Sequence, residues 1–128
     1  RSRSDRKRMS TVTGKGRAAV TSWKVKQRFG SVTLLEIHPE TGRTHQIRVH
    51  LASIGLPILG DKVYGTKSRK KKHDGQIHLN LGSVINRQAL HAAQLTFKHP
   101  TSFRIVEFFS PLPHDIQEAI RICGGIII

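Results

Sequence analysis

The spacing of apolar residues predicts two strands near the start of the chain, at residues 18–29 and 31–38, joined at Gly30. In the first strand, Trp23 and Val25 alternate with lysines, which is typical of a strand with one buried and one solvent-facing side. The second strand is apolar at most positions, as expected of a strand that is buried on both sides. The pair therefore predicts a β-hairpin.

A helix is expected next, at residues 44–54. Thr44 has the side chain of an N-cap residue, and Gly55 stands where a left-handed C-cap would end the helix before Pro57. The core-facing stripe of this helix would consist of Ile47, Leu51 and Ile54. A different face carries His45, Arg48 and Ala52. An imidazole and a guanidinium near a helix N-terminus can hold an anion or a carboxylate, but the same residues also suit a solvated polar face.

The later part of the chain predicts a second hairpin and a second helix. Apolar and polar residues alternate at 91–98, and residues 103–109 are largely strand formers. Pro113 begins a helix that ends at the glycine pair 124–125. The prediction is therefore an α+β unit at residues 18–125, with a mixed, mostly antiparallel sheet and two helices.

Three further segments stand apart from this unit. Residues 1–17 are rich in lysine and arginine and are expected to be a basic arm or linker. Residues 66–75 are equally basic and predict a flexible loop, which could be a solubilising surface loop or could contact phosphates. Residues 126–128 form an apolar tail that no pattern explains.

The charge of the chain points to a polyanionic partner. Its 128 residues include 22 lysines and arginines but only 8 aspartates and glutamates, which gives a formal net charge of +14. Such an excess favours RNA or DNA, because each neutralised phosphate releases counterions. An anionic membrane surface is a weaker alternative, because the sequence has no long basic amphipathic helix with aromatic residues on one face.

The sequence contains little that would bind a metal. The single cysteine, Cys123, excludes an internal disulfide and a multi-cysteine zinc site, and it is expected to pack as a small apolar residue. His45 and His50 are not spaced as a helical zinc pair. No apolar run has transmembrane length. We therefore expect no metal and no membrane partner, and a reducing, cytoplasmic location.

One long motif narrows these possibilities. Residues 42–52 read GRTHQIRVHLA, and residues 55–65 follow as G-x-P-I-x-G-D-x-x-Y-G. Together they resemble the signature block of the RluA-type pseudouridine synthases, which isomerise uridine in ribosomal or transfer RNA. Similar stretches before and after it, at residues 5–21, 90–100 and 111–115, extend the resemblance over nearly the whole chain.

The resemblance implies a set of site residues. Arg48 would be the active-site arginine that pairs with a catalytic aspartate and keeps it ionised and oriented. Residues at the rim of the site, near the RNA, would be Arg43, Thr44, His45 and Gln46. Leu90 and His91 would lie at the cavity wall. The family's chemistry needs no cofactor and no metal, and the target base must be flipped out of its stack.

The family's nucleophile is missing from this sequence. The catalytic aspartate of the family lies in an H-R-L-D-x-x-T-S-G block well upstream of the arginine, and no such block is present. The aspartates of this chain are Asp5, Asp61, Asp74 and Asp115, and the resemblance places Asp61 in a structural loop. The chain therefore resembles the C-terminal half of a catalytic domain, with the N-terminal half and RNA as expected partners and no activity expected of the chain alone.

Two other functions compete with this interpretation. A non-catalytic basic RNA-binding module would have the same composition, with the arginine block serving as a structural helix. A nuclease that uses His45 and His50 is a poor fit, because no carboxylate or metal cluster accompanies them in the sequence.

Overall fold

The computed structural model of the chain describes residues 6–12, 18–65 and 80–127. Its elements form two antiparallel sheets and helices, in this order: β1 (Arg6–Val12), β2 (Ala18–Arg28), β3 (Thr33–Pro39), α1 (Gln46–Ser53), β4 (Gln94–Lys98), β5 (Ile105–Phe109) and α3 (His114–Ile122). Residues 80–82 form a further helical turn. The predicted α+β class is confirmed, but the described strands form two separate sheets, one of three strands and one of two.

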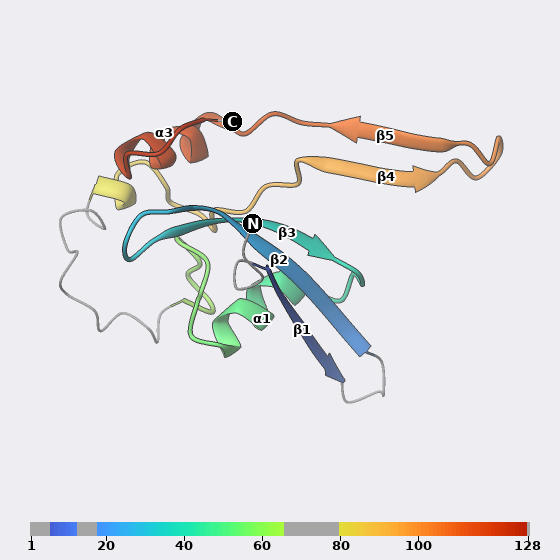
Figure 1. Cartoon of the computed structure of the whole chain (residues 1–128), viewed down its shortest axis with the longest axis horizontal. Coiled ribbons are helices and arrows are strands. Elements are labelled where there is room, and N and C mark those ends of the chain that lie inside the picture. The colour runs from blue at the N-terminus through green and yellow to red at the C-terminus, as the bar shows by residue number, and fades with distance from the viewer. Residues whose placement is uncertain (1–5, 13–17, 66–79, 128) are drawn as a thin grey trace.

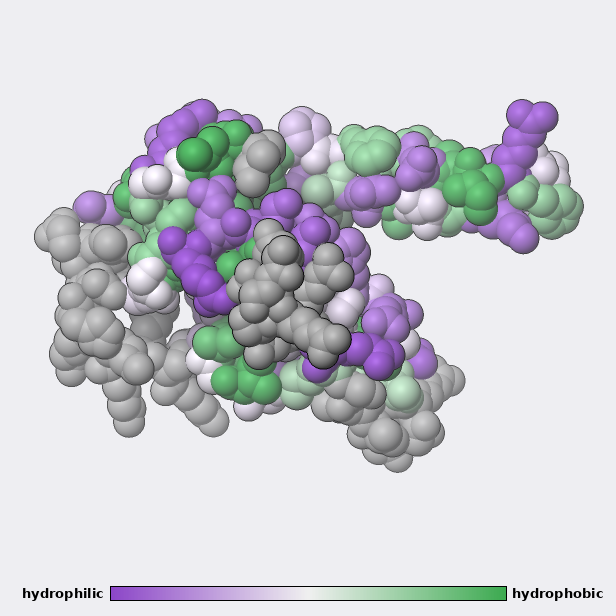
Figure 2. All heavy atoms as spheres, viewed as in Figure 1, coloured by the Kyte–Doolittle hydropathy of each residue, from purple (hydrophilic) through white to green (hydrophobic). Residues whose placement is uncertain are grey.

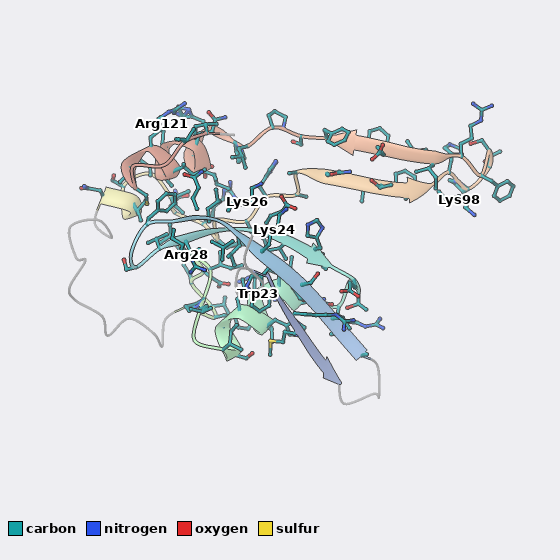
Figure 3. All side chains as sticks on the ribbon, viewed as in Figure 1. Trp23, Lys24, Lys26, Arg28, Lys98 and Arg121 are labelled. Carbon is teal, nitrogen blue, oxygen red and sulfur yellow. The ribbon has the colours of Figure 1, made fainter. Side chains whose placement is uncertain are left out.

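The first sheet has the order β1-β2-β3, with β2 in the centre and α1 against one face (Figure 1). The predicted hairpin is confirmed as β2 and β3. Figure 3 shows Trp23 on the α1 side of β2, and Lys24 and Lys26 on the opposite side. The side chains of Ala19, Thr21 and Trp23 are buried, because the alternation of a strand directs every second residue toward the helix.

Strand β1 lies where the sequence predicted an irregular basic arm. It pairs with β2 in antiparallel register, with Lys7 opposite Trp23 and Met9 opposite Thr21. Composition gave no sign of this strand, because its pairing depends on the free edge that β2 offers rather than on local apolar residues.

Strand β3 is less buried than its sequence predicted. None of its residues is fully buried, because α1 covers one face of the sheet at β2 and the described residues leave much of β3 open. Between Val25 and Gln27 the register with β3 shifts by one residue, which is the mark of a β-bulge. The expectation of a strand covered on both faces was therefore wrong.

The main hydrophobic core lies beside this sheet, around helix α3. The buried members of this core are Leu81, Ile85, Ile116, Ala119 and Ile120. Phe29, Val32 and Leu34 from the β2–β3 hairpin pack against it, as does the half-buried Cys123, whose thiol pKa is raised by burial. The predicted final helix is confirmed, with Pro113 as its N-cap and Gly124 in the left-handed conformation at φ 84° just after it.

The C-terminal tail is bonded to β2. The side chain of Gln27 donates to the carbonyl of Ile126 over 2.7 Å and accepts from the amide of Ile126 over 3.0 Å. Ile127 packs against the main core. A side chain at Gly125 would meet the ring of Phe29, so a larger residue here would displace that ring. The apolar tail is therefore part of the fold up to residue 127.

Strands β4 and β5 form the predicted second hairpin, which projects from the rest of the molecule (Figure 1). Leu95, Phe97 and Phe108 lie on one face, with the rings of Phe97 and Phe108 stacked at a centroid distance of 6.0 Å. These three side chains are 40–59% exposed, and Figure 2 shows apolar residues along the projecting hairpin. The hairpin therefore carries an apolar face that the described residues do not cover.

Several predictions from the sequence lie outside the described residues. These are the basic loop at 66–75, most of the N-terminal arm outside β1, and the aspartates Asp5 and Asp74. In the part of the chain that the structure does describe, no helix is both long and apolar enough to span a bilayer.

Candidate active site around Arg48

Helix α1 begins one residue later than its sequence predicted. Its N-cap is His45, with φ 50° and ψ 26°, and no side chain caps the helix. Thr44 is therefore not the N-cap, and that prediction was wrong. The left-handed conformation is uncommon for a residue other than glycine and is tolerated when neighbouring contacts hold it. At the other end, Gly55 has φ 80°, which confirms the predicted left-handed termination.

The amide of Gln46 fixes the start of this helix against β2. Its nitrogen donates to the carbonyl of Val20 over 2.7 Å and to the hydroxyl of Thr21 over 2.9 Å. Its oxygen accepts from the hydroxyl of Thr41 over 2.6 Å and from the backbone amide of Arg43 over 3.1 Å. Gln46 is buried and bonded on all sides within the fold, and this geometry does not favour contact with RNA.

One turn further along, His50 continues the same buried polar contact. Its Nδ1 shares a 2.8 Å hydrogen bond with the hydroxyl of Thr21. The buried face of α1 therefore consists of Gln46, His50 and Leu51, whereas Ile54, which the sequence assigned to the core stripe, is 43% exposed. Because β2 offers hydrogen-bond partners as well as apolar contacts, a partly polar helix face is buried here without unsatisfied groups.

Arg48 forms a buried ion pair with Asp61. The guanidinium Nε donates to Asp61 Oδ2 over 2.8 Å, and Nη2 donates to Oδ1 over 3.0 Å. The side chain of Asp61 is completely buried and that of Arg48 is 12% exposed. Asp61 Oδ1 also accepts hydrogen bonds from the backbone amides of Val63 and Tyr64, each over 3.0 Å. Two charged and two backbone contacts therefore fix this carboxylate.

The ion pair shifts the pKa of each of its two groups in the direction that favours the charged form. The bond from Arg48 holds the pKa of Asp61 well below its usual range, and the bond to Asp61 raises the pKa of Arg48. A carboxyl group with a lowered folded-state pKa stabilises the fold above its ordinary pKa and loses this contribution as the pH falls through the lowered value. The pair therefore stabilises the fold at neutral pH and weakens in acid.

Tyr64 lies against the face of the same guanidinium. The Cζ atom of Arg48 is 5.0 Å from the centre of the Tyr64 ring, within the range of a cation–π contact. The hydroxyl of Tyr64 shares a 3.0 Å hydrogen bond with Nδ1 of His45, and the two rings meet edge to face. Arg48 is therefore held along one edge by Asp61 and on one face by Tyr64.

The rest of the guanidinium is not engaged by the residues that the structure describes. Its hydrogen bonds to Asp61 come from Nε and Nη2, and no described group accepts a hydrogen bond from Nη1. An arginine bound sideways in this way keeps a second edge with donors that can hold another carboxylate or a phosphate.

The segment that contains Leu90 and His91 lies beside the loop that carries Asp61. The backbone amide of Ala89 donates to the carbonyl of Leu59 over 2.8 Å, two residues before Asp61. Gly60 has φ 80°, and a side chain there would collide with the carbonyl of Arg87. Leu90 and His91 are partly exposed, and Nε2 of His91 lies 3.0 Å from the carbonyl of Ser110.

Three of the predicted rim residues are exposed. Arg43, Thr44 and His45 lie in the turn before α1, on the same end of the helix as Gln46. They remain available to a ligand that approaches this end of α1, whereas Gln46 is not.

Comparison with known proteins identifies the family of the chain. Residues 2–53 match the family model described as RNA pseudouridylate synthase. The chain is 43% identical over 106 residues to the ribosomal large subunit pseudouridine synthase D of Haemophilus ducreyi, covering 83% of this chain. It is 48% identical over 117 residues to an uncharacterized RNA pseudouridine synthase of Chloroflexus aurantiacus, and 47% identical over 121 residues to another, YlyB, of Bacillus subtilis.

The chain belongs to the RluA-type RNA pseudouridine synthase family. The matches cover 91% and 94% of this chain for the last two relatives, but 33–35% of the length of the three relatives themselves. The chain thus spans about a third of the length of the pseudouridine synthases that it matches.

In this pseudouridine synthase segment the sequence identified Arg48 but missed its partner. The motif suggested a structural loop for Asp61, and the loop is indeed ordered by backbone bonds to that carboxylate. The pairing itself joins residues 13 apart across a turn, and no helical or strand periodicity relates them. The sequence did carry a signal for these contacts. The G-D and Y-G pairs of the motif contain Asp61 and Tyr64, and both residues contact Arg48.

Proposed function

We propose that this chain supplies the arginine-bearing part of the catalytic site of an RNA pseudouridine synthase. The observation that carries the proposal is the guanidinium of Arg48, which is nearly buried, fixed along one edge by Asp61, and open along another among the described residues. Its substrate is a uridine in ribosomal or transfer RNA, and its product is the carbon-linked isomer of that uridine.

The reaction requires a reacting aspartate, and both described aspartates of this chain are held in ion pairs. Isomerisation breaks the bond between the ribose and N1 of the base, turns the base, and rejoins it through C5, which loses its proton. A carboxylate nucleophile or base starts this sequence. Of the described aspartates, Asp61 is paired with Arg48 and Asp115 with Arg87. The reacting aspartate is therefore proposed to come from a partner segment, the N-terminal half of the catalytic domain.

Arg48 suits the role of a partner to that aspartate. A guanidinium remains charged at any physiological pH and presents a planar pair of donors to a carboxylate. Pairing keeps the reacting carboxylate ionised and oriented in a site from which water is excluded. The target base must also be flipped out of its stack, which costs a few kcal/mol. The exposed residues Arg43, Thr44 and His45 are proposed to contact the RNA at the rim, with Leu90 and His91 at the wall.

The uncovered face of the β4–β5 hairpin supports a partner segment. Leu95, Phe97 and Phe108 form an exposed apolar surface on a two-stranded sheet, and such a sheet is marginally stable without a packing partner. We propose that the same N-terminal half covers this face.

The chain is expected to bind structured RNA through phosphates, because its net charge is +14. Its affinity for a ribosomal RNA fragment should fall steeply between about 50 and 200 mM salt, since each phosphate contact releases counterions. Filter binding at several salt concentrations measures the slope. Affinity that does not depend on salt, or no binding at low salt, would contradict this expectation.

The isolated chain is expected to show no synthase activity, because its described aspartates are committed to ion pairs. RNA with tritium at C5 of uridine should release only background label when incubated with the purified chain. The positive control is a synthase that also contains the nucleophile-bearing segment. Robust release by the chain alone would show that one of its own carboxylates carries out the chemistry.

The alternative is a non-catalytic basic RNA-binding module, in which the arginine block is a structural helix. Both functions predict RNA binding by the isolated chain, so binding does not distinguish them. Tritium release by the complete synthase distinguishes them, because a binding module has none with or without its partner segment.

A further inference from the structure

Two aspartate–arginine pairs of the same geometry occur in the described part of the chain, and their differences are informative. Arg48 binds Asp61 through Nε and Nη2, at 2.8 and 3.0 Å, and Arg87 binds Asp115 through the same two atoms, both at 3.0 Å. The remaining nitrogen of Arg87, Nη1, donates to the backbone carbonyls of Gln88 and Leu90. Arg87 therefore uses all three nitrogens inside the fold.

Arg48 differs because its Nη1 has no acceptor among the described residues. It is also the more deeply placed of the two, since its side chain is 12% exposed and that of Arg87 is 40% exposed. No buried side-chain nitrogen or oxygen of the described residues lacks a partner, so Nη1 of Arg48 reaches solvent and can donate to a further ligand. The pair of Arg87 with Asp115 is thus complete within the described fold, whereas the pair of Arg48 with Asp61 leaves one nitrogen available to a further acceptor.

Asp61 is itself held more firmly than a carboxylate in an ordinary surface pair. The backbone amides of Val63 and Tyr64 bond to its Oδ1, and the backbone of Gly65 donates to its carbonyl over 3.0 Å. The preceding Gly60 packs against the carbonyl of Arg87, where a side chain would not fit. The position of the Asp61 carboxylate is therefore fixed by its own loop, and the guanidinium of Arg48 lies where it can bond to that carboxylate.

We propose that Asp61 is a positioning residue for the isomerisation: its carboxylate fixes one edge of Arg48 so that the other edge is aimed at the reacting carboxylate of the partner segment. This inference rests on the proposed function. Asp61 does not touch the substrate, and it acts through Arg48. Tyr64, on the face of the guanidinium, limits rotation of Arg48 about its own axis. A catalytic group that is already held in its reactive position lowers the activation barrier, because it does not have to be ordered during the reaction.

The test uses the synthase in which this chain is joined to its nucleophile-bearing segment. Asp61→Asn keeps the shape of the side chain and an acceptor for the two backbone amides, but it removes the charge that holds Arg48. Its single-turnover rate should fall on the order of 100-fold, the cost of a misplaced catalytic group, while RNA affinity stays unchanged. Asp61→Glu keeps the charge and should retain an intermediate rate.

A double-mutant cycle and a stability control separate positioning from folding. If Asp61 acts through Arg48, adding Asp61→Asn to an Arg48→Lys enzyme should cost little further rate, because the two changes are coupled. Ile120→Ala, in the main core, lowers stability without touching the ion pair and should leave the rate of the folded enzyme unchanged. Where Asp61→Asn does not fold, the Asp61→Glu enzyme tests the same role through a displaced charge: its rate should be reduced, and that loss should nearly disappear in the Arg48→Lys enzyme.

The outcomes distinguish this inference from the proposed function. A normal rate in folded Asp61→Asn enzyme, or rate losses that add fully in the cycle, would overturn the positioning role while leaving synthase activity and Arg48 intact. A rate loss no larger than that of Ile120→Ala would do the same. An unsubstituted enzyme without any tritium release would overturn the proposed function itself, and this inference with it.

Discussion

Replacing Arg48 with alanine in the complete synthase is expected to abolish or nearly abolish turnover. Arg48 is nearly buried, and the proposed function gives it a second carboxylate to hold in addition to Asp61. Removing one partner of a buried charge pair costs about 3–5 kcal/mol, because the other charge is left uncompensated. The part of this cost that appears in the barrier reduces the rate about tenfold for each ~1.4 kcal/mol.

A lysine variant and a binding measurement separate a loss of catalysis from a loss of RNA binding. Arg48→Lys should restore the rate only partly, because an ammonium cannot hold two carboxylates along two edges. RNA affinity should change little, because one charge is a small part of a net charge of +14. Single-turnover kinetics and filter binding on the same preparations measure both. Near-normal rates with lost binding would instead make Arg48 an RNA-backbone contact.

The same substitution in the isolated chain is expected to lower the free energy of unfolding by at most about 3–5 kcal/mol, because it removes the charged partner of the buried Asp61 carboxylate and opens that group to water. Urea unfolding at neutral pH measures this loss. The difference between the two proteins should shrink in acid, since the lowered pKa of Asp61 in the native chain means that the native pair is lost as the pH falls, whereas protonation relieves the unpaired charge in the variant.

Two further variants serve as controls for the stability measurement. The double substitution Arg48→Met and Asp61→Asn removes both charges, keeps an acceptor for the backbone amides, and should recover most of the lost stability. Arg121→Ala removes the partner of Glu118 from an exposed ion pair and should change stability little. If Arg48→Ala behaved like Arg121→Ala, the buried pair would not contribute to the fold as the structure indicates. The double variant also offers a stable protein that should lack turnover in the complete synthase.

Local sequence patterns determined several elements of this fold. The alternation around Trp23 predicted β2, and the alternation at residues 91–98 predicted the strand that became β4. Pro113 and Gly124 marked the limits of α3 because their backbone preferences are independent of the rest of the chain. The motif around Arg48 identified the family and the arginine of the proposed site, since motif positions are read without knowing what surrounds them.

Other features depended on partners distant in the sequence. Strand β1 forms because β2 offers an edge, and its basic composition did not predict it. The apolar tail is ordered because Gln27, 99 residues away from Ile126, bonds to its backbone. The burial of Gln46 and the exposure of Ile54 reverse what a helical wheel predicts, because β2 provides polar partners for one side of α1. Periodicity reports which residues share a face but not what that face will meet.

Some features of the candidate site were likewise predictable from the sequence, and others were not. The sequence by itself determined that Arg48 lies on a helix near exposed rim residues, because the helix, its motif and its C-terminal glycine are local features. Only the tertiary structure decided that Asp61 and Tyr64 hold the guanidinium and that one of its edges stays open among the described residues. The physical reason is that a buried charge selects its partner by proximity in the folded chain, which is set by the turn at Gly60 and by the packing of residues 87–89 beside it.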